Sequence, residues 1–436
     1  MELNPGYRQT EVGVIPEDWR VKQVRDLKPF VTSGSRGWAA YYSDRGSLFI
    51  RITNLSRETI YLNLEDLRFV NLKATDSEAS RTQLQDEDVL ISITADIGII
   101  GYVSPRVRKP AYINQHIALM RFDPGHSNSK FISYFLASGK PQGLFRALTD
   151  SGAKAGMNLT AVQQIHLALP PTKAEQNAIA DALSDMDALI ESLEELTVKK
   201  RYLKQSALHE MLTGKKRLPG YDNTRSYKQT ESGLIPEDWD STPLGELGHW
   251  KGGATPSMRN ARYWVNGTVP WVSSGDVKSS LISDTPMKIT ESAVKESSTT
   301  VLPSHSILIV TRSGILRRHL PVAKNTCPMA INQDIKALTP SRKAIPDYLL
   351  QLLISSGPQI LARCLKSGTT VESIELPWLK AFQVPLPPTK AEQQDIAGVL
   401  SDMDADLDAL EDKLAKARHL KLGMMEELLT GRSRII

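Results

Sequence analysis

The sequence predicts an α+β protein with two globular domains of mixed helix and strand, joined by two long antiparallel helices that form a coiled-coil-like spacer with internal pseudo-two-fold symmetry. Three observations carry this prediction: a repeat that runs through the chain, a long helical pattern near the end of each copy, and short β-rich runs between the repeated segments. The length of 436 residues also exceeds the usual size of one hydrophobic core, which favours more than one domain.

The repeat consists of segments that return almost unchanged, while the residues between them diverge. Each copy is 217 to 220 residues long. The matching segments are YRQTEVGVIPEDW at 7–19 and YKQTESGLIPEDW at 227–239, LPPTKAEQ at 169–176 and 386–393, and EMLTG at 210–214 and ELLTG at 427–431. The expected organisation is a first domain at 1–168, a long helix with a linker at 169–219, a second domain at 220–385 and a second long helix at 386–436.

The segment LPPTKAEQ predicts the start of a helix. Pro171 suits the first turn, Thr172 can cap the helix, and Glu175 three residues later completes a capping-box pattern. No proline or glycine interrupts the chain from there to Gly214, which allows about 42 residues, or about 63 Å, of helix.

Apolar residues recur near the 3.5-residue period of a coiled coil in both long helices. A stripe of that length must be covered, and the matching stripe of the other copy is the expected partner. Packing of each helix against its own domain alone is the alternative. Antiparallel pairing about a pseudo-two-fold axis would put the two domains at opposite ends of the pair. The expected seam consists of Leu183, Met186, Leu193, Leu196, Leu203, Leu400, Met403, Leu407, Leu410 and Leu414.

The divergent inserts predict α+β domains. Short β-rich runs alternate with turn residues, and one apolar stretch in each insert has the pattern of a helix. The strand candidates are SLFIRI (47–52), DVLISIT (88–94), AYINQHIALMRF (111–122), TVPWVSS (268–274), SILIVTR (306–312) and AINQDIKAL (330–338), and the helix candidates are SKFISYFLASG (129–139) and PDYLLQLLISSG (346–357).

The sequence lacks the motifs of a methyltransferase acting on exocyclic amino groups and of an ATP-driven motor. NPGY at 4–7 lacks the second proline of an (N/D)PP(Y/F) methyltransferase motif, and the sequence has no GxxxxGK[ST] phosphate loop. The eight histidines never show HExxH or HxH spacing, so neither a metal nor a catalytic residue is predicted. The distant Cys327 and Cys364 favour a reducing cytoplasm, and we find no export signal and no apolar run of membrane-spanning length.

Basic and amide side chains lie in or beside turns that follow the apolar strands. Arginine, asparagine and glutamine can pair with base edges in the major groove, although each is also a common surface residue, and buried amides often satisfy backbone groups. Trp38 and Trp271 could stack on bases, but core packing is the favoured role. A formal net charge of +4 permits a polyanionic partner without requiring one. The candidate DNA-binding residues are Arg36, Arg51, Asn114, Gln115, Arg259, Arg312, Arg317, Arg318, Asn332 and Gln333.

In combination, these segments resemble the specificity (S) subunit of Type I restriction–modification systems. The resemblance rests on GVIPEDW and GLIPEDW, the two copies of LPPTKAEQ before a long helix, the LTG closures, and the DVLIS and INQ elements of the inserts, and it spans essentially the whole chain. It implies that the inserts are target recognition domains, each reading one half of a bipartite, asymmetric site in double-stranded DNA. The second insert departs from the family pattern, since TRSGILRRHLPVA has one glycine where TADIGIIGYV has two.

The resemblance also implies a non-catalytic chain that binds no cofactor itself. Two methyltransferase subunits would bind the long helices, and restriction subunits would join through the complex. S-adenosylmethionine, ATP and magnesium are expected on those partners. Two other functions stay open at this point: a self-contained DNA methyltransferase or nuclease, and a two-headed scaffold that binds proteins.

Overall fold

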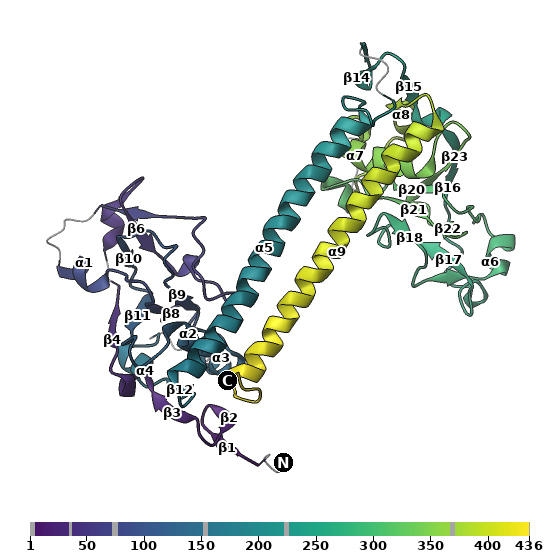
Figure 1. The fold of residues 1–436 in the computed structure, drawn as a ribbon. Coiled ribbons are helices and arrows are strands. Elements are labelled where there is room, and N and C mark those ends of the chain that lie inside the picture. The colour runs from purple at the N-terminus through teal and green to yellow at the C-terminus, as the bar shows by residue number, and fades with distance from the viewer. Residues whose placement is uncertain are drawn as a thin grey trace. The chain divides into compact units, whose positions relative to one another are not determined.

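The computed structural model describes residues 5–34, 37–71, 77–150, 156–221, 226–366 and 371–435. The chain divides into two compact units, Met1–Glu195 with Glu411–Ile436, and Leu196–Leu410. Each unit contains one divergent insert together with part of each long helix (Figure 1). The duplication in the sequence is therefore a duplication of folded units, each completed by a segment from the other copy of the repeat.

The first unit is built on a four-stranded antiparallel sheet. Its strands are β1 (Tyr7–Thr10), β2 (Gly13–Pro16), β3 (Arg20–Gln23), β4 (Phe30–Ser33), β5 (Tyr42–Ser43), β6 (Ser47–Ile50), β7 (Phe69–Val70), β8 (Val89–Ser92), β9 (Ile100–Tyr102), β10 (Ala111–Ile113), β11 (Ile117–Arg121) and β12 (His166–Leu169). Its short helices include α1 (Ser77–Thr82), α2 (Ser129–Ala137), α3 (Gly139–Asp150) and α4 (Leu159–Gln163). The main sheet has the order β4-β11-β8-β9, and a second sheet has the order β10-β6-β7-β5, in which β10 and β6 are parallel.

The second unit repeats this plan with different strands. Its strands are β13 (Tyr227–Thr230), β14 (Gly233–Pro236), β15 (Asp240–Pro243), β16 (Gly248–Gly252), β17 (Val269–Val272), β18 (Leu281–Ile282), β19 (Lys288–Ile289), β20 (Ile307–Val310), β21 (Val322–Asn325), β22 (Ala330–Ile331), β23 (Ile335–Pro340) and β24 (Gln383–Leu386). Its short helices include α6 (Glu291–Glu296), α7 (Pro346–Cys364) and α8 (Leu376–Ala381). The main sheet has the order β16-β23-β20-β21-β18, and β17 pairs in parallel with β22 as β6 does with β10.

The central strands β8 and β20 are largely apolar because both faces of each main sheet are covered. In β8, Val89 and Ile91 join the core that contains α2, while Leu90 joins a second core on the other face. Successive side chains of a strand point to opposite faces, so a strand between two cores reads as a continuous apolar run. β20 repeats the arrangement, with Ile307 and Ile309 in one core and Leu308 and Val310 in the other.

The two long helices are α5 (Lys173–Leu212, 40 residues) and α9 (Lys390–Leu428, 39 residues), close to the predicted length. Thr172 Oγ1 accepts a hydrogen bond from the Glu175 amide at 3.2 Å, and Thr389 does the same for Glu392 at 3.2 Å. The cap predicted at Thr172 is thereby confirmed, and Thr389 repeats it in the second copy. The carboxylates of the two glutamates do not complete a capping box but bind arginines, as described below.

The glutamine of the repeated segment ties each long helix to a helix of the same unit. Gln176 Oε1 accepts a hydrogen bond from the amide of Asn128, the N-cap residue of α2, at 3.0 Å. Gln393 Oε1 accepts one from the amide of Ile345, the N-cap residue of α7, at 2.9 Å. Threonine, glutamate and glutamine of LPPTKAEQ thus each have a structural role that both copies share.

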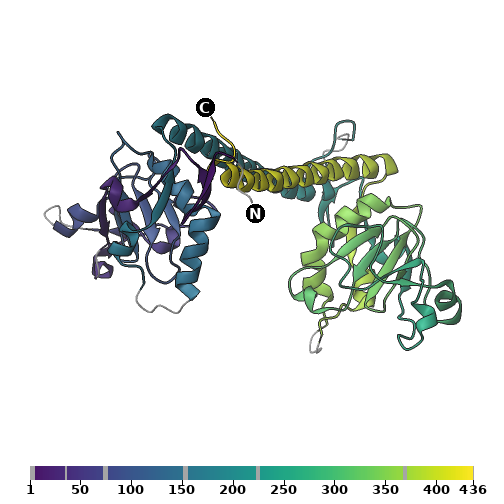
Figure 2. The same cartoon turned by 90° about the horizontal axis from the view of Figure 1, so that it is seen from below.

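The helices run antiparallel within each unit (Figures 1 and 2). In the first unit the ion pairs are Asp187–Lys421 and Glu194–Arg418, both 2.6 Å long. In the second they are Lys200–Asp406, at 2.8 Å, and Lys204–Asp404. Because the partner number on α9 falls as the number on α5 rises, the predicted antiparallel pairing is confirmed.

The seam differs from the prediction in the second half of α5. Leu196 and Leu203 are 40% and 49% exposed, whereas Thr197, one position after Leu196, is 4% exposed. Lys200 and Lys204 meet α9 there through ion pairs, so the seam is partly polar at this level and the two leucines lie outside it. Of the other predicted positions, Leu183, Leu400 and Leu407 are buried, and Met186, Leu193, Met403, Leu410 and Leu414 are half-buried.

The segment after each long helix docks on the opening segment of a repeat. Gly431 follows α9 with a backbone φ of +70°, and a Cβ atom added there would lie 2.5 Å from Pro16 and 3.1 Å from Trp19. The Tyr7 hydroxyl donates to the Gly431 carbonyl at 3.0 Å. Gly214, with a φ of +68°, approaches Pro236 and Trp239 in the same way after α5. The repeated IPEDW and LTG segments are therefore the two sides of one contact.

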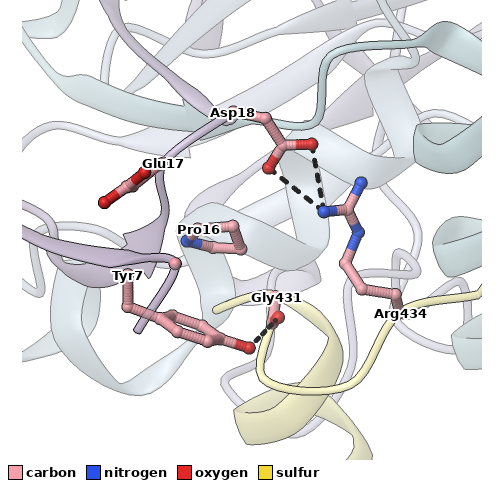
Figure 3. Close-up of a pocket in the computed structure, with 7 residues that line it drawn as sticks. Tyr7, Pro16, Glu17, Asp18, Gly431 and Arg434 are labelled. Atoms are coloured by element: carbon pink, nitrogen blue, oxygen red, sulfur yellow. Dashed lines mark hydrogen bonds and ion pairs between the residues drawn. The ribbon is translucent and has the colours of Figure 1, made fainter. Parts of the chain in front are cut away.

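An arginine clamps each docked segment. Arg434 contacts both Asp18 and Glu175. Together with Asp18, Tyr7, Pro16 and Gly431 it lines a cavity of about 300 Å³ (Figure 3). Arg217 is its counterpart and binds Asp238 at 2.8 Å and Glu392 at 2.7 Å. The guanidinium of Arg217 also lies over the ring of Trp239, 5.9 Å from its centroid. We refer to these two arrangements as the arginine clamps.

We expect Gly431→Ala to destabilise the protein by about 1–3 kcal/mol, because the residue has a positive φ and its Cβ would overlap Pro16. Gly423→Ala is the matched control, since Gly423 lies within α9 with nothing within 4 Å of an added Cβ. It should stabilise the chain by about 0.5–1 kcal/mol. Thermal unfolding of both variants measures the difference, and equal effects would contradict the docking.

We expect Arg217→Met to cost about 3–5 kcal/mol of unfolding free energy, because it leaves the carboxylate of Glu392 buried without its partner. The Arg217 and Glu392 side chains are 6% and 1% exposed. The exposed Lys200–Asp406 pair supplies the control: Lys200→Met should cost about 1 kcal/mol at most. Urea unfolding compares the two, and a small loss for Arg217→Met would argue against the clamp.

Candidate nucleic-acid interface

In the second unit, most of the predicted DNA-binding residues leave from one edge of the main sheet. Register pairs Gly252 with Lys336 and Val310 with Ile335, so β16 and β20 end where β23 begins. The segments that leave this edge are 253–260, 311–321 and 332–334. They contain the candidates Arg259, Arg312, Arg317, Arg318, Asn332 and Gln333.

These segments contact one another at their bases. The amides of Thr311 and Arg312 donate to the Asp334 carbonyl at 2.8 and 3.2 Å. The Thr255 hydroxyl donates to Gln333 Oε1 at 2.6 Å. A Cβ atom on Gly253 would lie 2.1 Å from the Asn332 carbonyl oxygen, so only glycine permits this approach. The sheet edge is therefore a single surface and not a set of independent loops.

Several basic side chains of this surface are available to a ligand. Arg259, Arg312 and Arg318 are exposed, and none has a side-chain hydrogen bond or ion pair with another described residue. Arg317 instead pairs with Glu372, and this interaction lowers the pKa of the Glu372 carboxyl below its usual value. Three unpaired guanidinium groups within one unit are suited to phosphates or guanine edges.

The corresponding edge of the first unit carries different chemistry. β4 and β8 end where β11 begins, since Ser33 pairs with Ala118 and Ser92 with Ile117. The segments there contain Thr94, Asn114, Gln115 and His116. Thr94 Oγ1 and His116 Nδ1 are 2.5 Å apart, and Gln115 Nε2 and His116 Nε2 are 2.9 Å apart. Arg36 lies outside the described residues.

In each of the two Asn-Gln pairs, the asparagine is buried and the glutamine is more accessible. Asn114 and Asn332 are 7% and 6% exposed. Their Oδ1 atoms accept hydrogen bonds from the amides of His116 at 3.2 Å and Asp334 at 3.1 Å, which is the geometry of an Asx turn. This favours a structural role for the asparagines, while Gln333 is exposed and Gln115 half-buried. A contact of any of the four with DNA stays a prediction.

Arg51, Trp38 and Trp271 have partners within their own domains. Arg51 binds Asp66 at 2.8 Å, and this hydrogen bond lowers the pKa of the Asp66 carboxyl. Trp38 is 3% exposed and packs edge-on against Tyr112. Trp271 is 6% exposed and donates through Nε1 to the Ala254 carbonyl. Both tryptophans thus have the core role that the sequence favoured.

Sequence reasoning missed two basic residues at these edges. Lys336 Nζ donates to the Gln333 carbonyl at 3.1 Å, and its place in INQDIK, three residues after the glutamine, was a usable signal. Arg57 contacts Asp96 and donates to the Ile97 carbonyl at 3.0 Å, so it anchors the segment that contains Thr94. A contact between residues so far apart in the sequence has no local signature.

Among the described residues, no group of three or more histidine, cysteine or acidic side chains is placed to hold a metal ion. In that part of the chain, no helix has the length and apolar character needed to cross a membrane.

The sequence profile described as "Type I restriction modification DNA specificity domain" matches residues 16–200 and 236–417, one stretch in each copy of the repeat. The chain belongs to this family. It is therefore a Type I specificity subunit with DNA-recognition domains, and such subunits are not the catalytic chains of their systems.

Individual relatives agree with the assignment. The chain is 36% identical over 200 residues to the EcoR124I/EcoR124II specificity subunit of Escherichia coli, a match that covers 46% of this chain and 48% of that protein. It is 25% identical over 436 residues to the putative MjaX specificity subunit of Methanocaldococcus jannaschii, covering 98% and 97%. The chain thus spans about half the length of the first relative and nearly all of the second.

Solved structures share the fold. The S subunit from M. genitalium matches with a TM-score of 0.58 and 15% identity over 98% of both chains. A chain from a study of complex assembly and conformational transition in a type I R-M system matches with a TM-score of 0.53 and 16% identity, covering 96% of this chain and 99% of that one. At these identities the likeness concerns the fold of the specificity subunit alone.

We expect Arg312→Ala to weaken binding of the cognate DNA by this specificity subunit, in complex with its partners, by about 1–3 kcal/mol, if the guanidinium reads a base. Loss of discrimination at one base pair would mark a base contact. A loss of affinity that is equal for all DNA sequences would mark a phosphate contact, and the slope of log affinity against log salt concentration would then be smaller by about one.

Arg342→Ala is the matched control for this experiment. Arg342 is also exposed in the second unit but follows the other end of β23, at the opposite edge of the same sheet. Its removal should leave affinity and salt slope unchanged in fluorescence anisotropy titrations. Equal losses for both arginines would contradict the assignment of the DNA-binding edge.

Proposed function

We propose that this chain recognises a bipartite, asymmetric site in double-stranded DNA, one half per recognition domain, and scaffolds the methyltransferase and restriction subunits of a Type I complex. The observation that carries the proposal is the contrast between the two sheet edges. Equivalent strands end at the same edge of the main sheet in both units. Thr94 and His116 lie at this edge in the first unit, whereas Arg312 and Asp334 occupy the equivalent positions in the second. Two units of equivalent fold that present different side chains at this edge suit two different DNA half-sites.

The duplication also fits the symmetry of the ligand. The DNA backbone has local two-fold axes, so a protein with pseudo-two-fold related units can contact two segments of one duplex equivalently. Half-site centres would then lie about one helical turn, or roughly 34 Å, apart or slightly more. Helices of 40 and 39 residues are about 60 Å long, which sets an upper bound on this separation.

The helix pair offers matching surfaces to two copies of a methyltransferase subunit, because the repeated segments occur twice. Restriction subunits would join through this complex. The chain itself would bind no cofactor, and S-adenosylmethionine, ATP and magnesium would act on the partner subunits. The target base would be flipped into the methyltransferase subunit. We place the complex in the cytoplasm, where the two unpaired cysteines would stay reduced.

Sequencing the methylated bases in the genome of a host that carries this chain and its methyltransferase subunit tests the proposal. We expect one asymmetric motif with two specified halves and a fixed gap. Arg312→Ala should change the specified bases in one half only, and Arg342→Ala should change neither. A continuous or palindromic motif would contradict reading by two different domains.

Two further assays separate the alternatives. Methyl transfer from labelled S-adenosylmethionine by the purified chain alone would identify a self-contained methyltransferase and overturn the proposal. Binding of a protein ligand with no affinity for DNA at low salt, with the methyltransferase subunits present, would favour a protein-binding scaffold. DNA binding that weakens steeply as salt rises is the result we expect.

A further inference from the structure

Each unit contains an ion pair that joins the two long helices at equivalent positions of the repeat. In the first unit, Asp187 of α5 binds Lys421 of α9 at 2.6 Å, and the side chains are 8% and 10% exposed. In the second unit, Lys204 of α5 binds Asp404 of α9, with side chains 20% and 36% exposed. Asp187 and Asp404 stand at the same position of the repeat, and so do Lys204 and Lys421.

A third side chain from the domain joins each pair. The Tyr134 hydroxyl of α2 donates to Asp187 Oδ2 at 2.6 Å, and Gln351 Nε2 of α7 donates to Asp404 Oδ2 at 3.0 Å. Burial and the adjacent carboxylate raise the pKa of Tyr134, so its hydroxyl stays a neutral donor. Each aspartate therefore connects α5, α9 and one helix of the recognition domain. We call these two sets the helix triads.

The surroundings of the triads make a shifted pairing costly. The neighbouring turns of the seam carry apolar side chains, including Leu183 and Met424 in the first unit and Leu400 and Leu208 in the second. A slip of one helical turn, about 5.4 Å, would place the charged groups opposite such residues. It would leave the buried Asp187 and Lys421, and the half-buried Lys204 and Asp404, without their partners. A seam of apolar contacts alone would tolerate such a slip better than the ion pairs do, because one leucine would take the place of another.

Two other ion pairs between the helices lack this property. Glu194–Arg418 and Lys200–Asp406 are more exposed, with side chains 45% and 55%, and 37% and 61%, open to solvent. Neither pair has a hydrogen bond to a domain helix among the described residues. Exposed pairs are screened by water and salt, so they discriminate weakly between registers.

We propose that the two helix triads fix the axial register of α5 against α9 and hold each recognition domain to that register, so that they determine which gap between half-sites the complex accepts. The effect on the gap between half-sites rests on the proposed function, whereas the effect on the register of α5 against α9 is independent of it. A slip of one turn corresponds to between one and two base pairs at about 3.4 Å each.

Thiol cross-linking in the full-length chain tests the structural part. In a Cys327→Ser background, Glu194→Cys with Arg418→Cys marks the observed register, and Glu194→Cys with Leu414→Cys or Leu422→Cys marks slips of one turn. With intact triads, a short bismaleimide should link only the first combination. When both triads are replaced (Asp187→Leu, Lys421→Leu, Lys204→Leu and Asp404→Leu), a shifted combination should link as well.

Leucine is chosen because replacing a buried ion pair by apolar residues usually preserves folding. A second variant guards against misfolding: Asp187→Lys with Lys421→Asp, combined with Lys204→Asp and Asp404→Lys, keeps opposite charges in the same register. It should link only the unshifted combination. Lys200→Leu with Asp406→Leu is the matched control from an exposed pair and should also leave the register unchanged. Links confined to the unshifted combination in the leucine variant would overturn the inference.

Methylation of duplexes whose half-site gap is changed by one and two base pairs tests the DNA consequence, using the chain with its methyltransferase subunits. Replacing both triads with leucine should lower the preference for the cognate gap about tenfold, while the exposed-pair control keeps it. If the wild-type complex shows no gap preference, the proposed function and this consequence both fail. If the wild type has a fixed gap and the leucine variant keeps it, the inference alone fails.

Discussion

The contact on which the structure depends is the arginine clamp. Arg217 follows the end of α5 and binds Glu392 in the first turn of α9, while Arg434 follows the end of α9 and binds Glu175 in the first turn of α5. Each clamp thus joins the end of one long helix to the beginning of the other, which is possible only if the helices run antiparallel. The same arginines reach Asp238 and Asp18, so the clamp also attaches the opening segment of a repeat. Because charged partners removed from water must be matched, these contacts admit few alternative arrangements.

Among the described residues, the contacts that hold the long helices and the domains together do not involve the side chains at the sheet edges, so these side chains can differ between the two units. Residues that hold the clamp, the cap and the link to α2 or α7 recur in both copies. At the sheet edges the Asn-Gln pairs recur, but Thr94 and His116 of the first unit are replaced by Arg312 and Asp334 in the second. At equivalent strand ends, a threonine–histidine contact stands in the first unit and an unpaired arginine in the second. A mutation at such an edge changes exposed groups without disturbing the core, because the strands behind it are buried on both faces. Stability and recognition therefore depend on different residues.

Local patterns predicted what local physics determines. The threonine caps and the uninterrupted apolar period predicted α5 and α9 closely, and alternation with turn residues predicted β8 and β20. The clamp escaped prediction because Glu175 and Arg434 are 259 residues apart, and the capping-box pattern offered a nearer role for the glutamate. Leu196 and Leu203 were assigned to the seam by periodicity alone, although lysines of the same helix had acidic partners on α9. The burial of Asn114 and Asn332 followed from the turn that each closes, which a list of polar residues after strands does not reveal.

The charge pattern of the helices explains why the antiparallel arrangement wins over a parallel one. In α5 the stretch 181–195 carries Asp181, Asp185, Asp187, Glu191, Glu194 and Glu195, and the following stretch carries Lys199, Lys200, Arg201 and Lys204. In α9 the acidic group is Asp402, Asp404, Asp406, Asp408, Glu411 and Asp412, followed by Lys413, Lys416, Arg418 and Lys421. A parallel pair would set acid against acid and base against base, whereas the antiparallel pair sets each acidic half against a basic half, as the ion pairs of both units show. Acidic residues nearer the helix start and basic residues nearer its end also suit the helix dipole, most strongly in the terminal turns. A helix with an acidic stretch followed by a basic stretch is complementary in charge to a second copy that runs in the opposite direction. Duplication of one such helix therefore supplies it with an antiparallel partner.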